Sequence, residues 1–141
     1  MKEKIRIENP AQTAELLKSY CNKKQEHFGI ICVDGGMNVI SRKELFKGGT
    51  SKSPVYLNVL FWEICRRSAC GVILFHNHPS GNVLPSEDDI ITTQKIEKGC
   101  ELLGIQLLDH VIVSRGKHYS FKEHSLIGNL EESEEKIAEK E

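Results

Sequence analysis

The stretch that most restricts the fold is an apolar run at residues 70–75 followed directly by His-Asn-His-Pro-Ser-Gly at positions 76–81. The run has the length and composition of a buried strand, and the proline and glycine after it favour a turn. Side chains alternate along a strand, so His76 and His78 are predicted to point to the same side. A fold that contains this stretch therefore places two imidazoles together at the end of a buried strand.

Asp89 is the third residue predicted to join this point. It follows the second histidine after ten intervening residues, in the first turn of a helix predicted over residues 86–103. At about 100° per residue, Asp89 heads an apolar stripe that continues with Ile96, Cys100 and Leu103. A carboxylate that faces the core needs a partner, and a metal ion shared with the two histidines would supply one.

The pattern along the whole chain predicts an α/β fold of the order α β β α β α β β, with a mixed sheet flanked by helices. The predicted elements are a helix at 10–21, antiparallel hairpin strands at 28–33 and from 37 onward, a helix opened by Ser53 and Pro54, the strand at 70–75, the helix at 86–103, and strands at 105–113 and 118–121. Because the strand at 70–75 follows a helix, a crossover connection predicts a parallel neighbour for it.

Length and charge predict one domain with a short tail. The chain has 141 residues, which suits a single core over residues 1–127. Residues 128–141 contain six glutamates and two lysines, and we expect a frayed or disordered acidic tail. The formal net charge of −1 then leaves the body only weakly basic. Nucleic-acid binding through this domain alone is therefore not expected.

Cysteine content and hydropathy bear on the compartment. The five cysteines are an odd number without a Cys-x-x-Cys pair, so we expect small core residues in a reducing environment. No apolar run reaches the roughly 18 to 20 residues of a membrane span, and the start carries no apolar signal region. These features predict a cytoplasmic protein with no membrane partner.

Two imidazoles and one carboxylate are a ligand set that catalytic zinc commonly has, with a fourth position open to water. The pKa of such a water falls toward roughly 7, so it becomes a nucleophile near neutral pH. Manganese or iron is also compatible with His76, His78 and Asp89. The alternative interpretation is that the histidines are loop residues satisfied by hydrogen bonds.

A hydrolytic site also needs a general base and a donor to the developing oxyanion. Glu26, Glu44 and Glu63 are the candidate bases: Glu26 precedes a buried strand, Glu44 is expected to be solvated, and Glu63 is expected on the polar face of its helix, opposite Leu60 and Ile64. Ser86 is predicted to cap the helix that follows it, and its hydroxyl is a candidate oxyanion donor.

These residues resemble a known signature. The motif at 76–81, with Pro85, Ser86 and Asp89, is similar to the His-x-His-Pro-x-Gly…Ser-x-x-Asp pattern of JAMM (MPN-type) metallopeptidases. The form His-Asn-His-Pro-Ser-Gly, with Glu26 before a strand and Leu-Asp-His at 108–110, resembles the RadC branch and its JAB domain. The resemblance covers about residues 9–125.

The resemblance implies a cytidine deaminase-like mixed sheet and one catalytic zinc ion that cleaves peptide or isopeptide bonds in a protein substrate. Carried over, His76, His78 and Asp89 would bind the metal, Glu26 would be the base and Ser86 the oxyanion donor. Long RadC proteins also carry an N-terminal helix-hairpin-helix segment, for which this chain has no room, so the DNA-repair label of the family is weak evidence here.

Two other classes of protein are compatible with this set of ligands. An idle metal-binding interaction module, linked to DNA repair or mobile elements, is the alternative, and a metal-dependent nuclease is a third hypothesis. The literal His-Asn-His tripeptide is not an HNH nuclease motif, whose residues are spread over a ββα element. Zinc deaminases need a Pro-Cys-x-x-Cys motif that is absent from the sequence. Asp109 and His110 are expected to satisfy the end of a strand.

Overall fold

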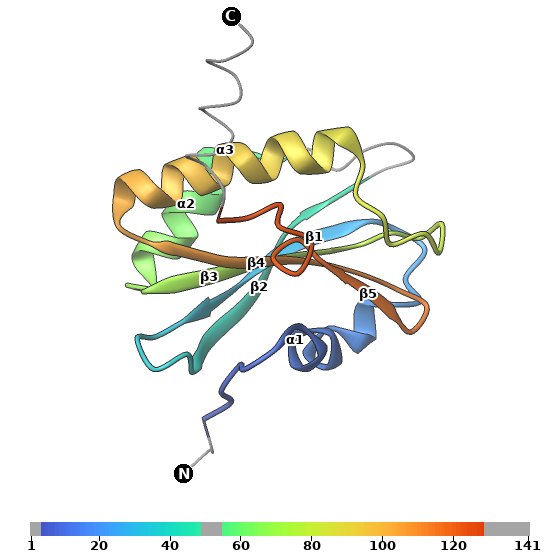
Figure 1. Cartoon of the computed structure of the whole chain (residues 1–141), viewed down its shortest axis with the longest axis horizontal. Helices are drawn as coiled ribbons and strands as arrows, with labels where there is room; N and C mark the ends of the chain where they lie inside the picture. The colour runs from blue at the N-terminus through green and yellow to red at the C-terminus, as the bar shows by residue number, and fades with distance from the viewer. Residues whose placement is uncertain (1–3, 49–54, 129–141) are drawn as a thin grey trace, which may run out of the picture.

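The structure is a computed structural model that describes residues 4–48 and 55–128. Within these residues a five-stranded mixed sheet is flanked by helices, as the sequence predicts (Figure 1). The elements are α1 (Pro10–Leu16), the 3-10 turn η1 (Lys18–Tyr20), β1 (His27–Val33), β2 (Val39–Lys47), α2 (Leu57–Arg66), β3 (Gly71–Asn77), α3 (Glu87–Leu103), β4 (Gln106–Ser114) and β5 (Lys117–Ser120). The predicted order of helices and strands is confirmed.

The strand order β2-β1-β3-β4-β5 places β3, which carries the histidines, at the centre of the sheet. β1 pairs antiparallel with both β2 and β3, whereas β3 pairs parallel with β4. The predicted parallel neighbour of β3 is therefore the strand that follows α3, and not one reached through α2. α2 connects β2 to β3 along the chain. In the sheet, however, β1 lies between these two strands.

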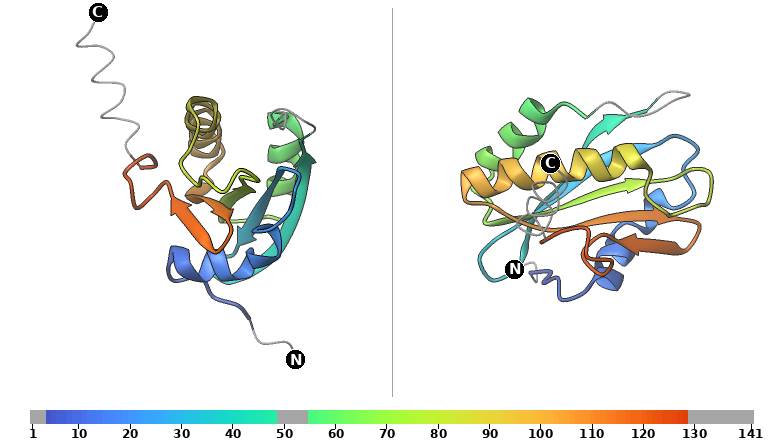
Figure 2. Two further views of the ribbon diagram at one scale, coloured as in Figure 1. Left: turned by 90° about the vertical axis from the view of Figure 1, so that its right-hand side faces the viewer. Right: turned by 45° about the horizontal axis from the view of Figure 1, so that its top comes forward.

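Helices cover both faces of the sheet. α2 and α3 lie on one face and α1 on the other (Figure 1, Figure 2). One apolar cluster joins the α2 and α3 side chains to the sheet, and a second joins Leu17 and Tyr20 to the opposite face. Every residue of β1 and β3 is buried, which explains the apolar runs at residues 28–33 and 70–75 of the sequence.

α3 begins and ends as its sequence predicts, but its buried stripe differs by one position. Ser86 caps its start and Gly104, at φ 71°, ends it. The buried residues are Thr93, Ile96 and Cys100, while Leu103 is 53% exposed. At about 100° per residue, the buried side of the helix is centred between Thr93 and Ile96. Leu103 lies at the edge of this side and is therefore partly exposed.

The first two helices are shorter than predicted. α1 ends at Leu16, and the chain continues as the 3-10 turn that still buries Tyr20. α2 begins at Leu57, and the predicted opening residues Ser53 and Pro54 lie outside the described residues, as does the tail from residue 129 onward.

The cysteine prediction holds in part. All five cysteines are free, and Cys32 and Cys100 are buried as expected, whereas Cys65 and Cys70 are exposed. Cys65 lies outside the buried side of α2, which contains Leu60, Glu63 and Ile64. In the described part of the chain no helix is long and apolar enough to cross a membrane.

Glu63 is buried, whereas the sequence predicted it on the polar face of its helix. We expect its replacement by glutamine to lower the free energy of unfolding by about 1–3 kcal/mol at pH 7. Its side chain is 4% exposed and accepts hydrogen bonds from Arg66 Nε (2.9 Å) and Arg67 Nε (3.2 Å). Burial acts against ionisation, but these arginines outweigh it and hold the pKa of Glu63 below its usual value.

The pH dependence of this effect follows from the lowered pKa. A carboxyl group with a depressed pKa stabilises the fold above its unfolded pKa of about 4.3, and the stabilisation is lost as the pH falls through the folded value. Urea unfolding should therefore show the Glu63→Gln difference shrinking below about pH 4, with the exposed Glu101→Gln as control. A difference that grows with acidity would contradict this assignment.

Candidate metal centre

Four predicted site residues meet at the end of the central strand. Glu26, His76, His78 and Asp89 each offer a ligand atom, and these atoms all lie within 4.8 Å of one another. They come from three places: the segment before β1, the end of β3 and the first turn of α3. Residues up to 63 positions apart in the sequence thus form one cluster.

The distances suit a single small cation. His76 Nε2 lies 2.8 Å from His78 Nε2. Asp89 Oδ2 lies 3.4 Å from His76 Nε2 and 3.2 Å from His78 Nε2. Ligand atoms about 2 Å from a tetrahedral zinc ion lie roughly 3.4 Å from one another, so small shifts would seat an ion among these three.

The Nδ1 atom of each histidine has a hydrogen-bond partner outside the cluster, so the Nε2 atom points into the cluster. His78 Nδ1 lies 2.7 Å from the Asn82 carbonyl oxygen, which can only accept, so Nδ1 donates and a neutral ring keeps its lone pair on Nε2. His76 Nδ1 lies 2.7 Å from His110 Nε2. The Nε2 atoms therefore face one another, an arrangement that a cation between them satisfies, and the donor set fits a metal ion.

The electrostatics of the cluster also favour a cation. Burial opposes ionisation of Asp89, but its contacts with the imidazoles of His76 and His78 outweigh this and hold its pKa well below the usual value. Burial lowers the pKa of His78, yet its contacts with Asp89 and with the Asn82 carbonyl outweigh this and raise the pKa. The cluster thus holds a carboxylate that stabilises positive charge on its neighbours.

Ser86 has the capping role that the sequence predicts. Its Oγ accepts from the Asp89 backbone N–H at 3.0 Å, and Asp89 Oδ2 accepts from the Ser86 backbone N–H at 2.9 Å. This capping box fixes the Asp89 carboxylate against the start of α3. Ser86 also lines the cavity described next, and its role as an oxyanion donor remains a prediction.

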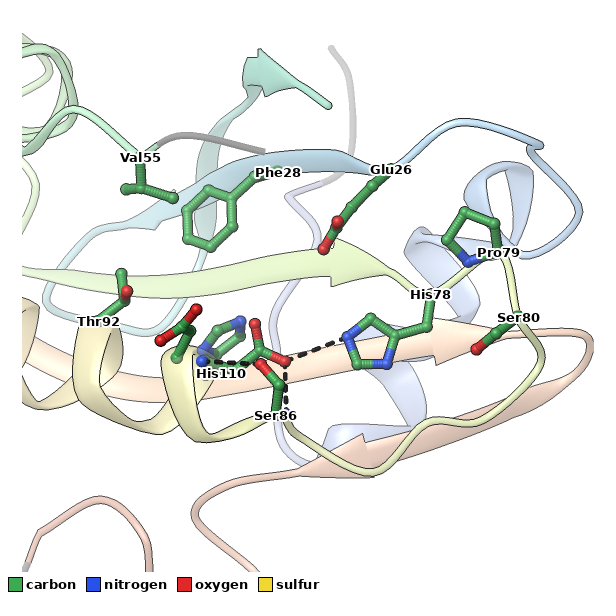
Figure 3. A pocket seen from close by; sticks show the side chains of 11 residues that line it. Glu26, Phe28, Val55, His78, Pro79, Ser80, Ser86, Thr92 and His110 are labelled. Atoms are coloured by element: carbon green, nitrogen blue, oxygen red, sulfur yellow. Dashed lines mark hydrogen bonds and ion pairs between the residues drawn. The ribbon is translucent and has the colours of Figure 1, made fainter. Parts of the chain in front are cut away.

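A cavity of about 450 Å³ opens beside the cluster. Its lining combines polar and apolar groups: Glu26, Phe28, Val55, His78, Pro79, Ser80, Ser86, Asp88, Asp89, Thr92 and His110. Glu26 points into it from the segment before β1 and His78 from the end of β3, with Ser86 at the start of α3 below them (Figure 3). The cluster can therefore be reached from solvent through this cavity.

The other candidate bases lie elsewhere. Glu44, which we expected to be solvated, is only 28% exposed because His27 Nδ1 contacts its carboxylate at 2.5 Å, with Lys47 Nζ at 4.0 Å. Glu63 is held by its two arginines. Glu26 is the one of the three that joins the metal cluster.

Asn77 holds the segment that carries Glu26, a role that sequence reasoning missed. Its Oδ1 accepts from the His27 backbone N–H at 2.7 Å, and its Nδ2 donates to the Gln25 carbonyl at 3.0 Å. The two residues that flank Glu26 are thus tied to β3. The sequence could have indicated this role, because strand alternation directs the Asn77 side chain away from the face that carries His76 and His78.

We expect Asn77→Ala to lower the free energy of unfolding by about 1–3 kcal/mol, because it leaves the His27 N–H and the Gln25 carbonyl without this partner. It should also reduce any activity that depends on Glu26. Urea unfolding measures the first effect, and Asn77→Asp should show no smaller a loss, because it keeps the acceptor for His27 but sets a buried carboxylate oxygen against the Gln25 carbonyl. Unchanged stability in Asn77→Ala would contradict the assigned role.

Asp109 and His110 lie within β4 and not at its end, so their expected position was wrong, but both side chains are satisfied by hydrogen bonds. Asp109 accepts from Ser120 Oγ at 2.6 Å and from the Lys122 N–H at 3.0 Å, and it secures the turn after β5. His110 is 1% exposed and contacts His76. Burial lowers the pKa of His110 well below its usual value. This buried ring lies next to the candidate metal centre.

The fold and the cluster together define a class: α/β domains whose mixed sheet carries a candidate metal centre where its central strand ends. The sequence profile of the RadC-like JAB domain matches residues 7–126, and the chain belongs to this family. Its sheet is consistent with the JAB/MPN-like fold that the sequence predicts.

Similar chains include UPF0758 proteins of Streptococcus pyogenes serotype M49 (strain NZ131) and serotype M1. Each is 39% identical over 117 residues, which is 82% of this chain and 52% of the relative. The chain thus spans about half the length of the curated relatives it matches.

Proposed function

We propose that this domain is a zinc-dependent hydrolase that cleaves peptide or isopeptide bonds. One observation carries the proposal: the Glu26 carboxylate lies 3.8 Å from His76 Nε2, beside the three proposed ligands and on the wall of the cavity. A structural zinc site is closed by four protein ligands, whereas Glu26 lies farther from His76 Nε2 than Asp89 does, at 3.8 Å against 3.4 Å, and lines the cavity.

The ligands in this proposal are His76, His78 and Asp89, a set that catalytic zinc commonly has. The bound ion would supply Lewis acidity, which makes water a competent nucleophile near neutral pH. The chain supplies the rest of the chemistry. Glu26 takes the proton of the attacking water and passes it to the leaving amine, so it serves first as base and then as acid.

Ser86 would stabilise the charge that develops on the carbonyl oxygen. Its Oγ acts as an acceptor in the helix cap, so the hydroxyl proton is not used there and can be donated into the cavity. Phe28 and Val55 contribute apolar surface to the same cavity. Such a wall lowers the local polarity and strengthens the interactions of the charged groups beside it.

A comparison of substrates tests the proposal. Metal-free protein is reconstituted with Zn²⁺, Mn²⁺ or Fe²⁺ and incubated with a peptide library, an isopeptide-linked model protein, and single- and double-stranded DNA. We expect products from the peptide or isopeptide substrates that disappear with a chelator. Metal binding without cleavage of any of these would contradict the proposal and favour an interaction module, while metal-dependent DNA cleavage alone would favour a nuclease.

A further inference from the structure

His110 forms the middle of a chain of hydrogen bonds that joins two of the proposed ligands from behind. His110 Nε2 lies 2.7 Å from His76 Nδ1, and its Nδ1 lies 2.7 Å from Thr93 Oγ1. Thr93 Oγ1 in turn lies 2.6 Å from the backbone carbonyl of Asp89, four residues earlier on α3. The chain of contacts therefore runs from Asp89 to His76 through two buried side chains.

The chemistry of these atoms sets the direction of every bond in the chain. A carbonyl oxygen only accepts, so the Thr93 hydroxyl donates its single proton to Asp89. Its oxygen can then only accept from His110, which must carry a proton on Nδ1. The Thr93 hydroxyl cannot serve both neighbours as donor.

The same reasoning continues to His76. His110 is 1% exposed and its ring stacks on Phe121 at 4.4 Å between centroids, surroundings in which a neutral ring is favoured over a cation. A neutral His110 with its proton on Nδ1 has a lone pair on Nε2. His76 Nδ1 must therefore donate to it, and His76 Nε2 is left as a lone pair directed at His78 and Asp89.

We propose that His110, together with Thr93, is a positioning residue that fixes His76 as the Nδ1–H tautomer and aims its Nε2 at the metal. The inference rests on the metal-binding part of the proposed function. Hydrogen-bond partners of metal-bound histidines set the ring orientation and the tautomer, and losing one costs about 10- to 100-fold in metal affinity. Here the partner is a second histidine, whose own tautomer is fixed by α3.

The first measurement is Zn²⁺ affinity, determined by competition with a chromophoric chelator. We expect about 10- to 100-fold weaker binding in His110→Phe, and weaker binding in Thr93→Val, which removes the hydroxyl at nearly constant volume. His118→Gln, which replaces an exposed histidine of β5, is the matched control and should bind as wild type does. Wild-type affinity in His110→Phe would overturn the proposal.

The second measurement reads the tautomer without metal or substrate. Two-bond ¹H–¹⁵N correlation spectra of metal-free protein labelled with ¹⁵N-histidine, recorded near pH 8, should show His76 and His110 as Nδ1–H tautomers in wild type. In Thr93→Val the preference of His76 should weaken while the rest of the spectrum keeps its dispersion. A wild-type His76 in the Nε2–H form would overturn the proposal.

The two proposals fail separately. A protein that binds Zn²⁺ through an Nδ1–H His76 but cleaves no peptide would contradict the proposed function and leave the role of His110 standing. A protein that cleaves peptides with His76 in the Nε2–H form would overturn the role of His110 and leave the proposed function standing.

Discussion

Replacement of Glu26 by glutamine is expected to lower the turnover number for peptide cleavage by about 10²- to 10⁴-fold, the usual contribution of a general acid–base group. Glutamine keeps the size of the side chain but cannot take a proton from water. Because Glu26 stands outside the group of three ligands that lie within 3.4 Å of one another, zinc content should stay near that of wild type.

The matched control for this variant is Glu15→Gln. It removes the same charge from a side chain that is 71% exposed and is not part of the cluster. Its turnover should equal that of wild type. Wild-type turnover in Glu26→Gln would remove Glu26 from the mechanism. Loss of zinc from Glu26→Gln would instead show that Glu26 is a metal ligand.

Replacement of Asp89 by asparagine is expected to abolish zinc binding at micromolar protein. The loss should exceed the roughly 10- to 100-fold typical of an outer hydrogen-bond partner, because a charged ligand itself is removed. The asparagine Oδ1 can still accept from the Ser86 N–H, so the cap of α3 is preserved. Chelator competition measures the affinity, and thermal unfolding of the metal-free proteins checks the fold.

Glu87→Gln is the control for Asp89→Asn, since Glu87 lies in the same first turn of α3 and is exposed. It should bind zinc as wild type does. If both variants lost the metal equally, the general negative charge at the helix start would explain the binding, and Asp89 would not be a specific ligand.

The sequence was sufficient to place the main chemical groups because their positions follow from local periodicity. Strand alternation put His76 and His78 on one side, and helix periodicity turned Asp89 toward the core. The structure then brought these residues within hydrogen-bond distances of one another. Glu26 was one of three candidate bases on its place before a buried strand, and the resemblance to a known family strengthened its assignment.

The supporting residues could not be predicted because their roles depend on which strands are neighbours. His110 reaches His76 only because β4 lies parallel beside β3, and Asn77 reaches the flanks of Glu26 only because β1 lies on the other side. The sequence predicted a parallel neighbour for β3 but not which strand it is. Glu63 was misplaced for a similar reason, since its burial depends on two arginines that fold back along α2.

The metal content of the purified protein tests the central claim most directly. Inductively coupled plasma mass spectrometry of wild type, Glu26→Gln and Asp89→Asn, each exposed to equal zinc and then dialysed, gives the number of ions per chain. The account predicts one zinc ion per chain in wild type and in Glu26→Gln, and none in Asp89→Asn. A wild-type protein that retains no metal ion, or an Asp89→Asn variant that retains a full one, would contradict it.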